Sequence, residues 1–368
     1  MPPKRNSTPE PANQRRITVR DIAEEVGLHF TTVAEALRGS SRIKEATRLR
    51  VEEAAQRLGY RPDPILSALS AYRSSNMRRS FQGVLVWING FPEKDFFIQD
   101  QSLHGFYGDC YKGALERAQV LGYKLEIFWM GQKRMSGKRA SNILKARNIL
   151  GVIVGPMPEM TSNIDLEWES FNSLRIGYSL TDSRITNVIS DQFANTQWAF
   201  QRLMEDGFKR IGFACPRYLD NRVSNKFSGA YLSMIYRHYR KPPIPMFLDE
   251  KKEGDPEAFL AWYEKYRPEV ILAGGRSVYY RVLSEAGIQI PERVQFVSLH
   301  CEYMRSPVAG ISQNGKAVGT VAVDHLVGMI QHFKIGLESH PKTTTILGRW
   351  VEGKSYQPEL LKRSGKPH

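Results

Sequence analysis

From residue 82 onward, short apolar runs alternate with segments long enough for helices, and this alternation restricts the fold more than any other feature. The clearest runs are 83–88, 124–130, 151–155 and 268–274. Continuous apolar runs of this length predict strands that are buried on both faces. Strands separated by helices are typical of a mostly parallel α/β sheet. We therefore expect residues 82–356 to form an α/β domain.

The segment 17–61 has a different pattern, which predicts three short helices. Thr18 is placed to cap the first helix, with Asp21 three positions later, and Gly27 ends it. The spacing of apolar residues predicts a second helix over 30–38 and a third over 45–58. This arrangement fits a helix-turn-helix, whose second helix reads base edges in the major groove. On periodicity alone, a three-helix cap that packs on the larger domain stays open.

Charge and composition limit the classes of protein to be considered. The chain of 368 residues carries 52 Lys and Arg against 38 Asp and Glu, a net charge of +14. Residues 1–79 hold 15 of the basic and 9 of the acidic residues, and 1–16 read as a flexible basic arm. This balance permits a nucleic-acid partner. No apolar stretch is long enough to cross a membrane and no secretory signal is apparent, so we expect a cytoplasmic, nucleoid-associated protein.

The three cysteines, at positions 110, 215 and 301, are far apart in the sequence. This spacing excludes a disulfide framework and any Cys-x-x-Cys metal knuckle. We expect neither a metal nor a cofactor.

Residues 17–63 resemble the DNA-binding headpiece of the LacI/GalR (lactose/galactose repressor) family. Their sequence is ITVRDIAEEVGLHFTTVAEALRGSSRIKEATRLRVEEAAQRLGYRPD, and it matches the family pattern at many positions and in the same order. The resemblance implies that Phe30, Thr31 and Glu35 read bases, and that Thr18 and Thr32 contact phosphates. A threonine hydroxyl bonds base edges, and a phenyl ring packs on a thymine methyl group.

Several headpiece residues depart from the family pattern. Glu35 replaces a common Arg; a carboxylate accepts from cytosine N4, so we expect an unusual operator, although a solvated helix residue is the alternative. His29 and Lys44 replace the serines that cap the second and third helices, at about 1 kcal/mol each. We expect Arg42 and Lys44 to contact phosphates and so to recover part of that loss.

Residues 62–81 resemble the family's hinge helix and linker. The resemblance places Leu69, with Ala68 before it, at the position that wedges into the minor groove. The helical pattern is too short to be stable alone, which suits folding coupled to DNA binding and dimer formation. A plain tether is the alternative.

The similarity continues at lower density and implies a periplasmic-binding-protein-like (type I) domain of two lobes. Lobe 1 is expected to comprise about 82–188 and 314–338, and lobe 2 about 189–312 and 340–356; 357–368 form a tail. Ligands of such sheets lie beyond the carboxyl ends of the strands. The candidate ligand-binding residues are Phe91, Phe106, Trp129, Tyr178, Arg222, Lys226, Arg276 and His300, and nearby loops add Asn89, Tyr107, Pro156, Arg217 and Gly275.

Two of these candidates differ from relatives. Lys226 stands where an Arg commonly grips the ligand, and His300 stands where an Asp bonds sugar hydroxyls. The aromatic set suits stacking on a sugar or another flat ligand, although core packing explains about half of such aromatic residues.

The resemblance therefore implies a transcriptional regulator, most simply a repressor, that binds a palindromic operator in double-stranded DNA as a homodimer. A small-molecule effector, a sugar or sugar derivative, would control it. Three alternatives remain. One is an enzyme on an α/β fold, although the sequence has none of the usual nucleotide-binding or nucleophile motifs. The others are an exported solute-binding protein and a regulator that responds to a protein partner or is constitutive. The tail has no leucine heptad, which favours a dimer over a tetramer.

Overall fold

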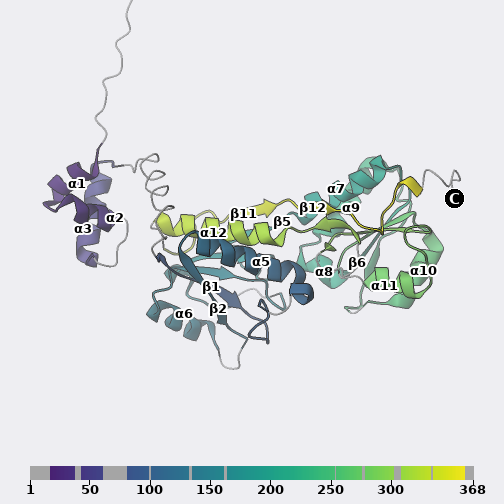
Figure 1. Ribbon diagram of the computed structural model, residues 1–368, viewed down its shortest axis with the longest axis horizontal. Helices are drawn as coiled ribbons and strands as arrows, with labels where there is room; N and C mark the ends of the chain where they lie inside the picture. Colours follow the sequence, from purple (N-terminus) through teal and green to yellow (C-terminus); the bar gives the residue numbers. More distant parts are fainter. Residues whose placement is uncertain are drawn as a thin grey trace, which may run out of the picture. The chain divides into compact units, whose positions relative to one another are not determined.

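The computed structural model describes residues 17–37, 43–60, 81–98, 101–131, 135–160, 164–252, 254–275, 278–301, 308–332 and 335–360, with only the backbone for 101–104 (Figure 1). The chain divides into two compact units, Met1–Ser80 and Phe81–His368. Arg42 and Arg276 and the whole expected hinge segment, with Ala68 and Leu69, lie outside the described residues.

The first unit is the expected three-helix bundle. Its helices are α1 (Val19–Val26), α2 (Phe30–Leu37) and α3 (Glu45–Arg57). All three bury apolar side chains in one small core, which centres on Ile22, Val33 and Val51, each fully buried. The predicted helix boundaries are confirmed to within one residue.

The helix ends show why the chain turns where it does. Thr18 and Asp21 form the predicted capping box at the start of α1, and Gly27 ends that helix with φ +64°. Lys44 gives α3 no side-chain cap, as expected. The prediction that α2 lacks a side-chain cap is partly wrong. The N–H of Thr31 donates to Nδ1 of His29 over 3.5 Å, and the Thr31 hydroxyl lies 2.8 Å from the same nitrogen.

The second unit contains two six-stranded sheets, which confirms the two-lobed α/β fold. The first sheet has the order β11-β5-β4-β3-β1-β2 and the second β12-β10-β9-β8-β6-β7. All neighbours are parallel except β10 and β12. The strands are β1 (Gly83–Asn89), β2 (Tyr123–Trp129), β3 (Gly151–Val154), β4 (Asn172–Ile176), β5 (Thr186–Ser190), β6 (Ile211–Pro216), β7 (Phe247–Asp249), β8 (Val270–Ala273), β9 (Gln295–Ser298), β10 (Ala309–Ser312), β11 (Thr343–Ile346) and β12 (Arg349–Val351).

Helices lie against these sheets and bury the central strands. Strands β3, β4, β5, β6, β8 and β9 are buried along their whole lengths, as is typical of parallel sheets covered on both faces. The helices are α5 (Gln101–Val120), α6 (Gly137–Ala146), η1 (Trp168–Ser170), α7 (Gln192–Glu205), α8 (Arg217–Arg222), α9 (Lys226–His238), α10 (Pro256–Tyr266), α11 (Val278–Glu285) and α12 (Gly315–Gln331).

Helices α5 and α12 lie side by side on the first sheet and approach each other through glycines (Figure 1). A Cβ on Gly319 would lie 1.8 Å from the carbonyl oxygen of Cys110, and one on Gly113 would lie 2.0 Å from that of Lys316. Side chains at these positions would force the helices apart, so glycine is required for this packing.

The chain crosses between the lobes three times, after β5, after β10 and after β11. The third crossing corrects the expected lobe boundaries, because Thr343–Ile346 pairs with β5 in the first sheet rather than with the second. The crossings are tied together. The side chain of Asn195 accepts from the N–H of Gly348 over 2.8 Å and donates to Ser190 Oγ over 3.1 Å, so it joins the first and third crossings.

In the described part of the chain, no helix has the length and apolar character needed to cross a membrane.

Candidate DNA-binding surface and effector cleft

The exposed start of α2 carries the expected base-reading residues. Phe30 is 45% exposed, Thr31 is exposed, and Thr32 and Glu35 are half-buried. The Arg20 guanidinium lies 5.9 Å from the centre of the Phe30 ring, and the His29 ring lies 4.6 Å from it. An exposed phenyl ring beside the Arg20 guanidinium offers an apolar contact together with positive charge, which is the chemistry of a DNA groove contact.

The predicted phosphate contacts have different surroundings. Thr18 is exposed, but its hydroxyl donates to Asp21 Oδ2 over 2.7 Å as part of the helix cap. Lys44 is exposed at the start of α3. Arg20 was not predicted, and its place beside Phe30 makes it a further candidate. Its signal in the sequence was only a basic residue in the first turn of the predicted helix.

A cavity of about 850 Å³ lies between the two lobes of the second unit. Its wall comes largely from residues after β1, β3, β4, β6, β8 and β9, which is the carboxyl edge that the strand rule predicts. The predicted residues on the wall are Phe91, Phe106, Tyr178, Arg222 and His300, with Tyr107, Pro156 and Gly275 from the wider set.

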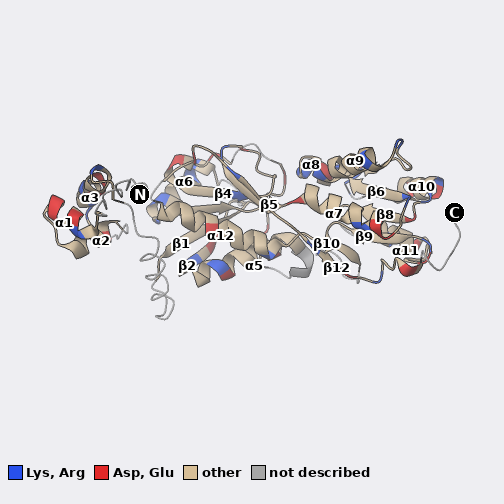
Figure 2. Ribbon diagram, turned by 90° about the horizontal axis from the view of Figure 1, so that it is seen from above, with Lys and Arg blue, Asp and Glu red and all other residues tan. Residues whose placement is uncertain are grey.

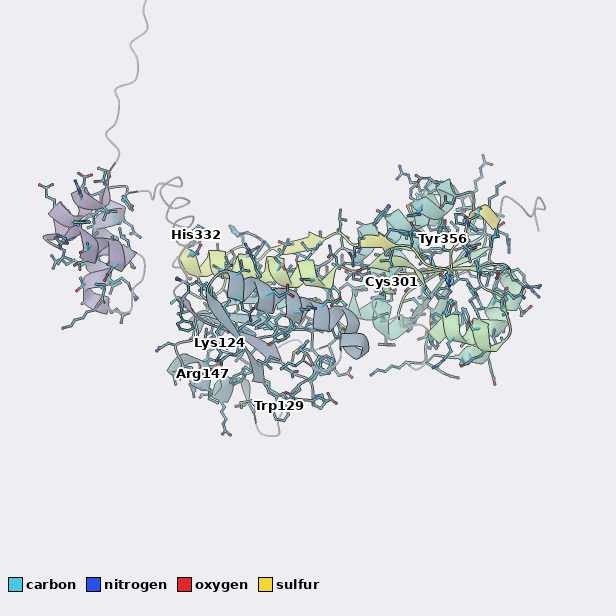
Figure 3. All side chains as sticks on the ribbon, viewed as in Figure 1. Lys124, Trp129, Arg147, Cys301, His332 and Tyr356 are labelled. Atoms are coloured by element: carbon cyan, nitrogen blue, oxygen red, sulfur yellow. The ribbon has the colours of Figure 1, made fainter. Side chains whose placement is uncertain are left out.

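Four other candidates do not line the cavity. Trp129, which is labelled in Figure 3, donates from Nε1 to the carbonyl oxygen of the wall residue Phe91 over 2.9 Å and so supports the wall without lining the cavity. Asn89 is fully buried and accepts from the N–H of Phe91 over 2.8 Å. Arg217 pairs with Glu250 over 2.5 Å. The fourth, Lys226, is described below.

One side of the cavity is aromatic. The rings of Phe91 and Phe96 are stacked with centroids 3.5 Å apart and planes within 5°. Tyr107 lies 6.3 Å from Phe91, and Phe106 is also on the wall. Phe96 was missed, because nothing in the sequence distinguishes it from its neighbour Phe97, which is buried in the core. This aromatic side suits contact with the apolar face of a ring.

Arg222 connects the lobes across the cavity. From α8 of the second lobe, its guanidinium donates to the carbonyl oxygens of Met157 and Pro158 and to the Tyr107 hydroxyl, the latter two over 2.8 and 3.2 Å. All three acceptors belong to the first lobe. The two lobes are therefore linked at the cavity by a side chain of the protein itself.

His300 lies on the wall with 8% of its surface exposed. Its Nδ1 accepts from the N–H of Gly275 over 3.2 Å, which places the proton of the neutral ring on Nε2. Burial lowers the pKa of His300 to about 4, so the ring is uncharged at neutral pH. A neutral imidazole here donates rather than accepts, unlike a carboxylate.

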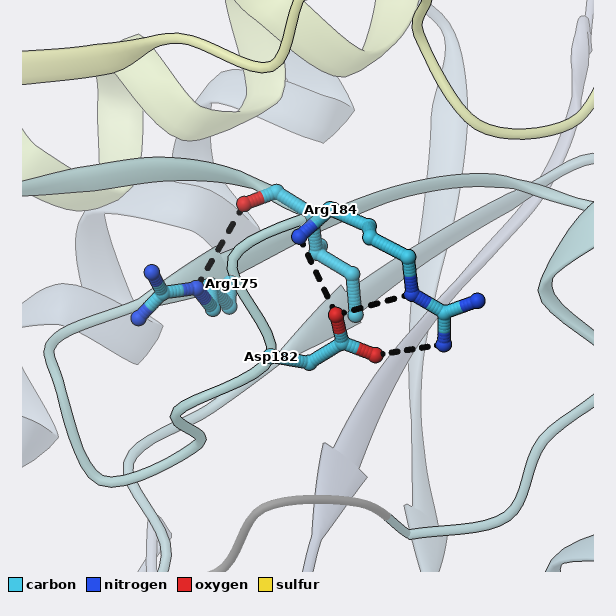
Figure 4. Close-up of polar contacts among 4 residues, drawn as sticks. Arg175, Asp182 and Arg184 are labelled. Carbon is cyan, nitrogen blue, oxygen red and sulfur yellow. Dashed lines mark hydrogen bonds and ion pairs between the residues drawn. The ribbon is translucent and has the colours of Figure 1, made fainter.

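Tyr178 is held in the wall from two directions. The Lys226 ammonium lies 5.6 Å from the centre of its ring, so Lys226 acts behind Tyr178 instead of facing the cavity. The loop that carries Tyr178 is fixed by buried Arg175, which donates to the carbonyl oxygens of Gly177, Leu180 and Ile185 over 2.9, 2.7 and 3.4 Å. Figure 4 shows the bond to Ile185. Arg175 was missed, because one arginine in a strand gives no signal.

Comparison with known proteins matches both units. The family described as "Bacterial regulatory proteins, lacI family" matches residues 18–63, and "Periplasmic binding protein-like domain" matches 200–356. The transcriptional regulator RegA of Clostridium saccharobutylicum is 22% identical over 85% of this chain and 92% of its own length. The repressor PurR of Aliivibrio salmonicida is 22% identical over 89% and 97%.

Solved structures show the same fold at low identity. A complex of the transcriptional regulator CelR with cellobiose has a TM-score of 0.54 at 18% identity and covers 93% of this chain and all of its own. The Lac repressor dimer bound to operator and an anti-inducer has a TM-score of 0.53 at 17% identity, over 93% and 99%. The chain therefore combines the helix-turn-helix domain of the lacI family of bacterial regulatory proteins with a periplasmic-binding-protein-like domain, and it is similar over most of its length to transcription regulators.

Proposed function

We propose that this regulator binds a palindromic operator as a homodimer, and that a small-molecule effector in the cleft controls its affinity for DNA. The observation that carries the proposal is the pairing of an exposed reading helix in one unit with a cavity between two lobes in the other. Closure of the lobes then changes how the two headpieces of a dimer reach their half-sites, so effector and DNA affinities are coupled reciprocally.

On the DNA side, the start of α2 enters the major groove. Phe30, Thr31 and Glu35 contact bases, while Thr18, Thr32, Arg42 and Lys44 contact phosphates. In the hinge, Leu69 and Ala68 contact the minor groove at the operator centre. The exposed positions of Phe30 and Thr31 at the start of α2 support this assignment.

In the cleft, the effector is a sugar or sugar derivative. The stacked Phe91 and Phe96 provide a face for a ring, and Arg222 and His300 provide donors for its oxygens. The similar CelR structure is a complex with cellobiose, and a LacI-family regulator from Enterococcus faecium, of TM-score 0.52, contains ribose.

The test is selection of bound sequences from a random DNA duplex pool by the purified full-length chain. We expect an enriched palindrome with a deformable centre. Substitution Glu35→Arg should change the preferred bases in each half-site and leave the spacing of the half-sites unchanged. If no sequence is enriched with or without sugars, the headpiece does not read DNA as proposed.

A second candidate function is a regulator that answers to a protein partner or acts constitutively. Arg222 favours it, because its bonds to Met157, Pro158 and Tyr107 join the two lobes through a side chain of the protein itself. Thermal unfolding separates the two, since a ligand that binds only the folded state raises Tm in proportion to ln(1 + [L]/Kd). Absence of any shift across sugars and metabolites would favour the second candidate.

A further inference from the structure

The ionisable side chains on the cavity wall are unevenly charged. Among the wall residues that the structure describes, the cations are Arg222, Lys252 and Arg281, and the one carboxylate is Glu159. Glu159 already pairs with Lys252 over 3.6 Å. Basic side chains therefore outnumber acidic ones among the described wall residues, and Figure 2 shows Lys and Arg in blue on the ribbon of α8.

Arg222 is the cation in the most enclosed position. The side chains of Lys252 and Arg281 are 64% and 66% exposed and water screens their charges, whereas Arg222 is half-buried. Its acceptors are two carbonyl oxygens and a phenol oxygen, and within the described residues no carboxylate lies at ion-pair distance from it. Three of its five N–H groups are used in these bonds, which leaves two donors for a ligand.

The rest of the wall does not balance this charge. His300 is neutral at pH 7 because it is buried, and the opposite side of the cavity is aromatic. A part-buried guanidinium bound only to neutral oxygens gains most from an anion, since charge-assisted hydrogen bonds are about twice as strong as neutral ones.

We infer that the effector is anionic: a sugar-sized ring compound whose carboxylate or phosphate binds the Arg222 guanidinium while its ring lies against Phe91 and Phe96. A cavity of about 850 Å³ has room for such a compound. The inference rests on the proposed role of the cleft as an effector site, and it narrows the chemical class from sugars in general to sugar acids or sugar phosphates.

The test compares matched neutral and anionic probes on the full-length chain by thermal unfolding and calorimetry. The probes are glucose, glucose 6-phosphate and glucuronate; galactose and galacturonate; and ribose and ribose 5-phosphate. We expect at least one anionic probe to bind more tightly than its neutral parent, with an affinity that falls as NaCl is raised. The phosphate and uronate arms show which anionic group is preferred.

Arg222→Met should weaken that anionic probe roughly 10- to 100-fold, the loss expected for hydrogen bonds to a charged group. Arg222→Lys, which keeps the charge, should recover part of the affinity and serves if the Met variant does not fold. Arg217→Met is the matched control, because Arg217 lies on the same helix but pairs with Glu250 outside the wall. It should leave binding unchanged.

The two proposals fail in different ways. Suppose that neutral sugars bind, that this binding is lost in Phe91→Ala, and that no anionic probe binds. The effector site would then stand, but the anionic effector would be overturned. Anionic binding that is unchanged in Arg222→Met and Arg222→Lys would also overturn it. If no probe of either charge stabilises the chain, both the anionic effector and the sugar assignment are contradicted.

Discussion

At the scale of single residues, the buried side chain of Arg175 shapes the cleft without an ion pair to a carboxylate among the described residues. Arg175 bonds to three carbonyl oxygens of its own loop, and burial lowers its pKa from the ordinary value. Its neighbour Arg184 makes a surface pair with Asp182 (Figure 4). Arginine thus fixes the loop at position 175, whereas at position 184 its side chain is solvated.

Arg175→Met should reduce the free energy of unfolding by about 1–3 kcal/mol, because it leaves the carbonyl oxygens of Gly177 and Leu180 buried without donors. It should also weaken effector binding through displacement of Tyr178. Denaturant unfolding and calorimetry measure the two effects. Arg184→Met is the control and should change both quantities much less; equal effects of the two substitutions would contradict the positioning role of Arg175.

His300 makes stability depend on pH in a defined direction. Its pKa is lowered to about 4 in the folded state, against an ordinary value of 6.5. Between these values the unfolded chain binds a proton that the folded chain does not, so this contribution to stability is lost as pH falls from 6.5 to 4. We expect His300→Gln to flatten the pH dependence of Tm in that window. An unchanged slope would show that His300 is not the titrating group.

At the scale of elements, the contact between α5 and α12 depends on the absence of side chains. Gly319 faces the carbonyl oxygen of Cys110, whereas Gly328 on the same helix has nothing within 4 Å of where its Cβ would be. Alanine should therefore have opposite effects at the two positions.

Gly319→Ala should destabilise the second unit by about 1–3 kcal/mol through overpacking. Gly328→Ala should stabilise it by about 0.5–1 kcal/mol, because alanine is the better residue in a helix interior. Thermal unfolding of the two variants measures the difference. A similar Tm for both would mean that α5 and α12 can separate at little cost.

The hinge element is tested through its predicted wedge. Leu69→Ala should weaken binding to the selected operator more than binding to unrelated duplex, because a wedge gains only where the central step deforms readily. Binding to both duplexes under the same salt conditions measures this. Equal losses on the two would leave Leu69 as part of a plain tether.

At the scale of the whole molecule, a net charge of +14 accompanies a DNA-binding unit. We expect log K for DNA to fall linearly with log salt, with a slope set by the phosphates that Lys and Arg neutralise. Lys44→Gln should reduce that slope by about one per headpiece. A slope that does not change on substitution would remove Lys44 from the phosphate contacts.

The sequence was most informative where a local rule decides the structure. The capping box at Thr18, the turn at Gly27 and the all-apolar strand β8 follow directly from residue type. Strands β4 and β5 were not predicted, because Arg175 and Asn187 interrupt their apolar pattern although both strands are fully buried. The Arg175 guanidinium reaches carbonyl oxygens as far along the chain as Ile185, which no local pattern reveals.

The location of the cleft was predictable from the sequence, but the contacts of its individual side chains were less so. The strand-end rule located Phe91, Arg222 and His300 on the wall. It also included Trp129, which supports the wall without lining the cavity, because a strand end specifies a loop but not the direction of each side chain.

The third crossing has a consequence for biosynthesis. Strands β11 and β12 are edge strands of different sheets, yet both lie within residues 343–351. A chain growing from its N-terminus therefore carries two five-stranded sheets, each with an unpaired edge, until residues 343–351 have been translated. A premature stop before residue 343 would leave both lobes incomplete at once, so such fragments are expected to aggregate or to be degraded rather than to persist as half-active regulators.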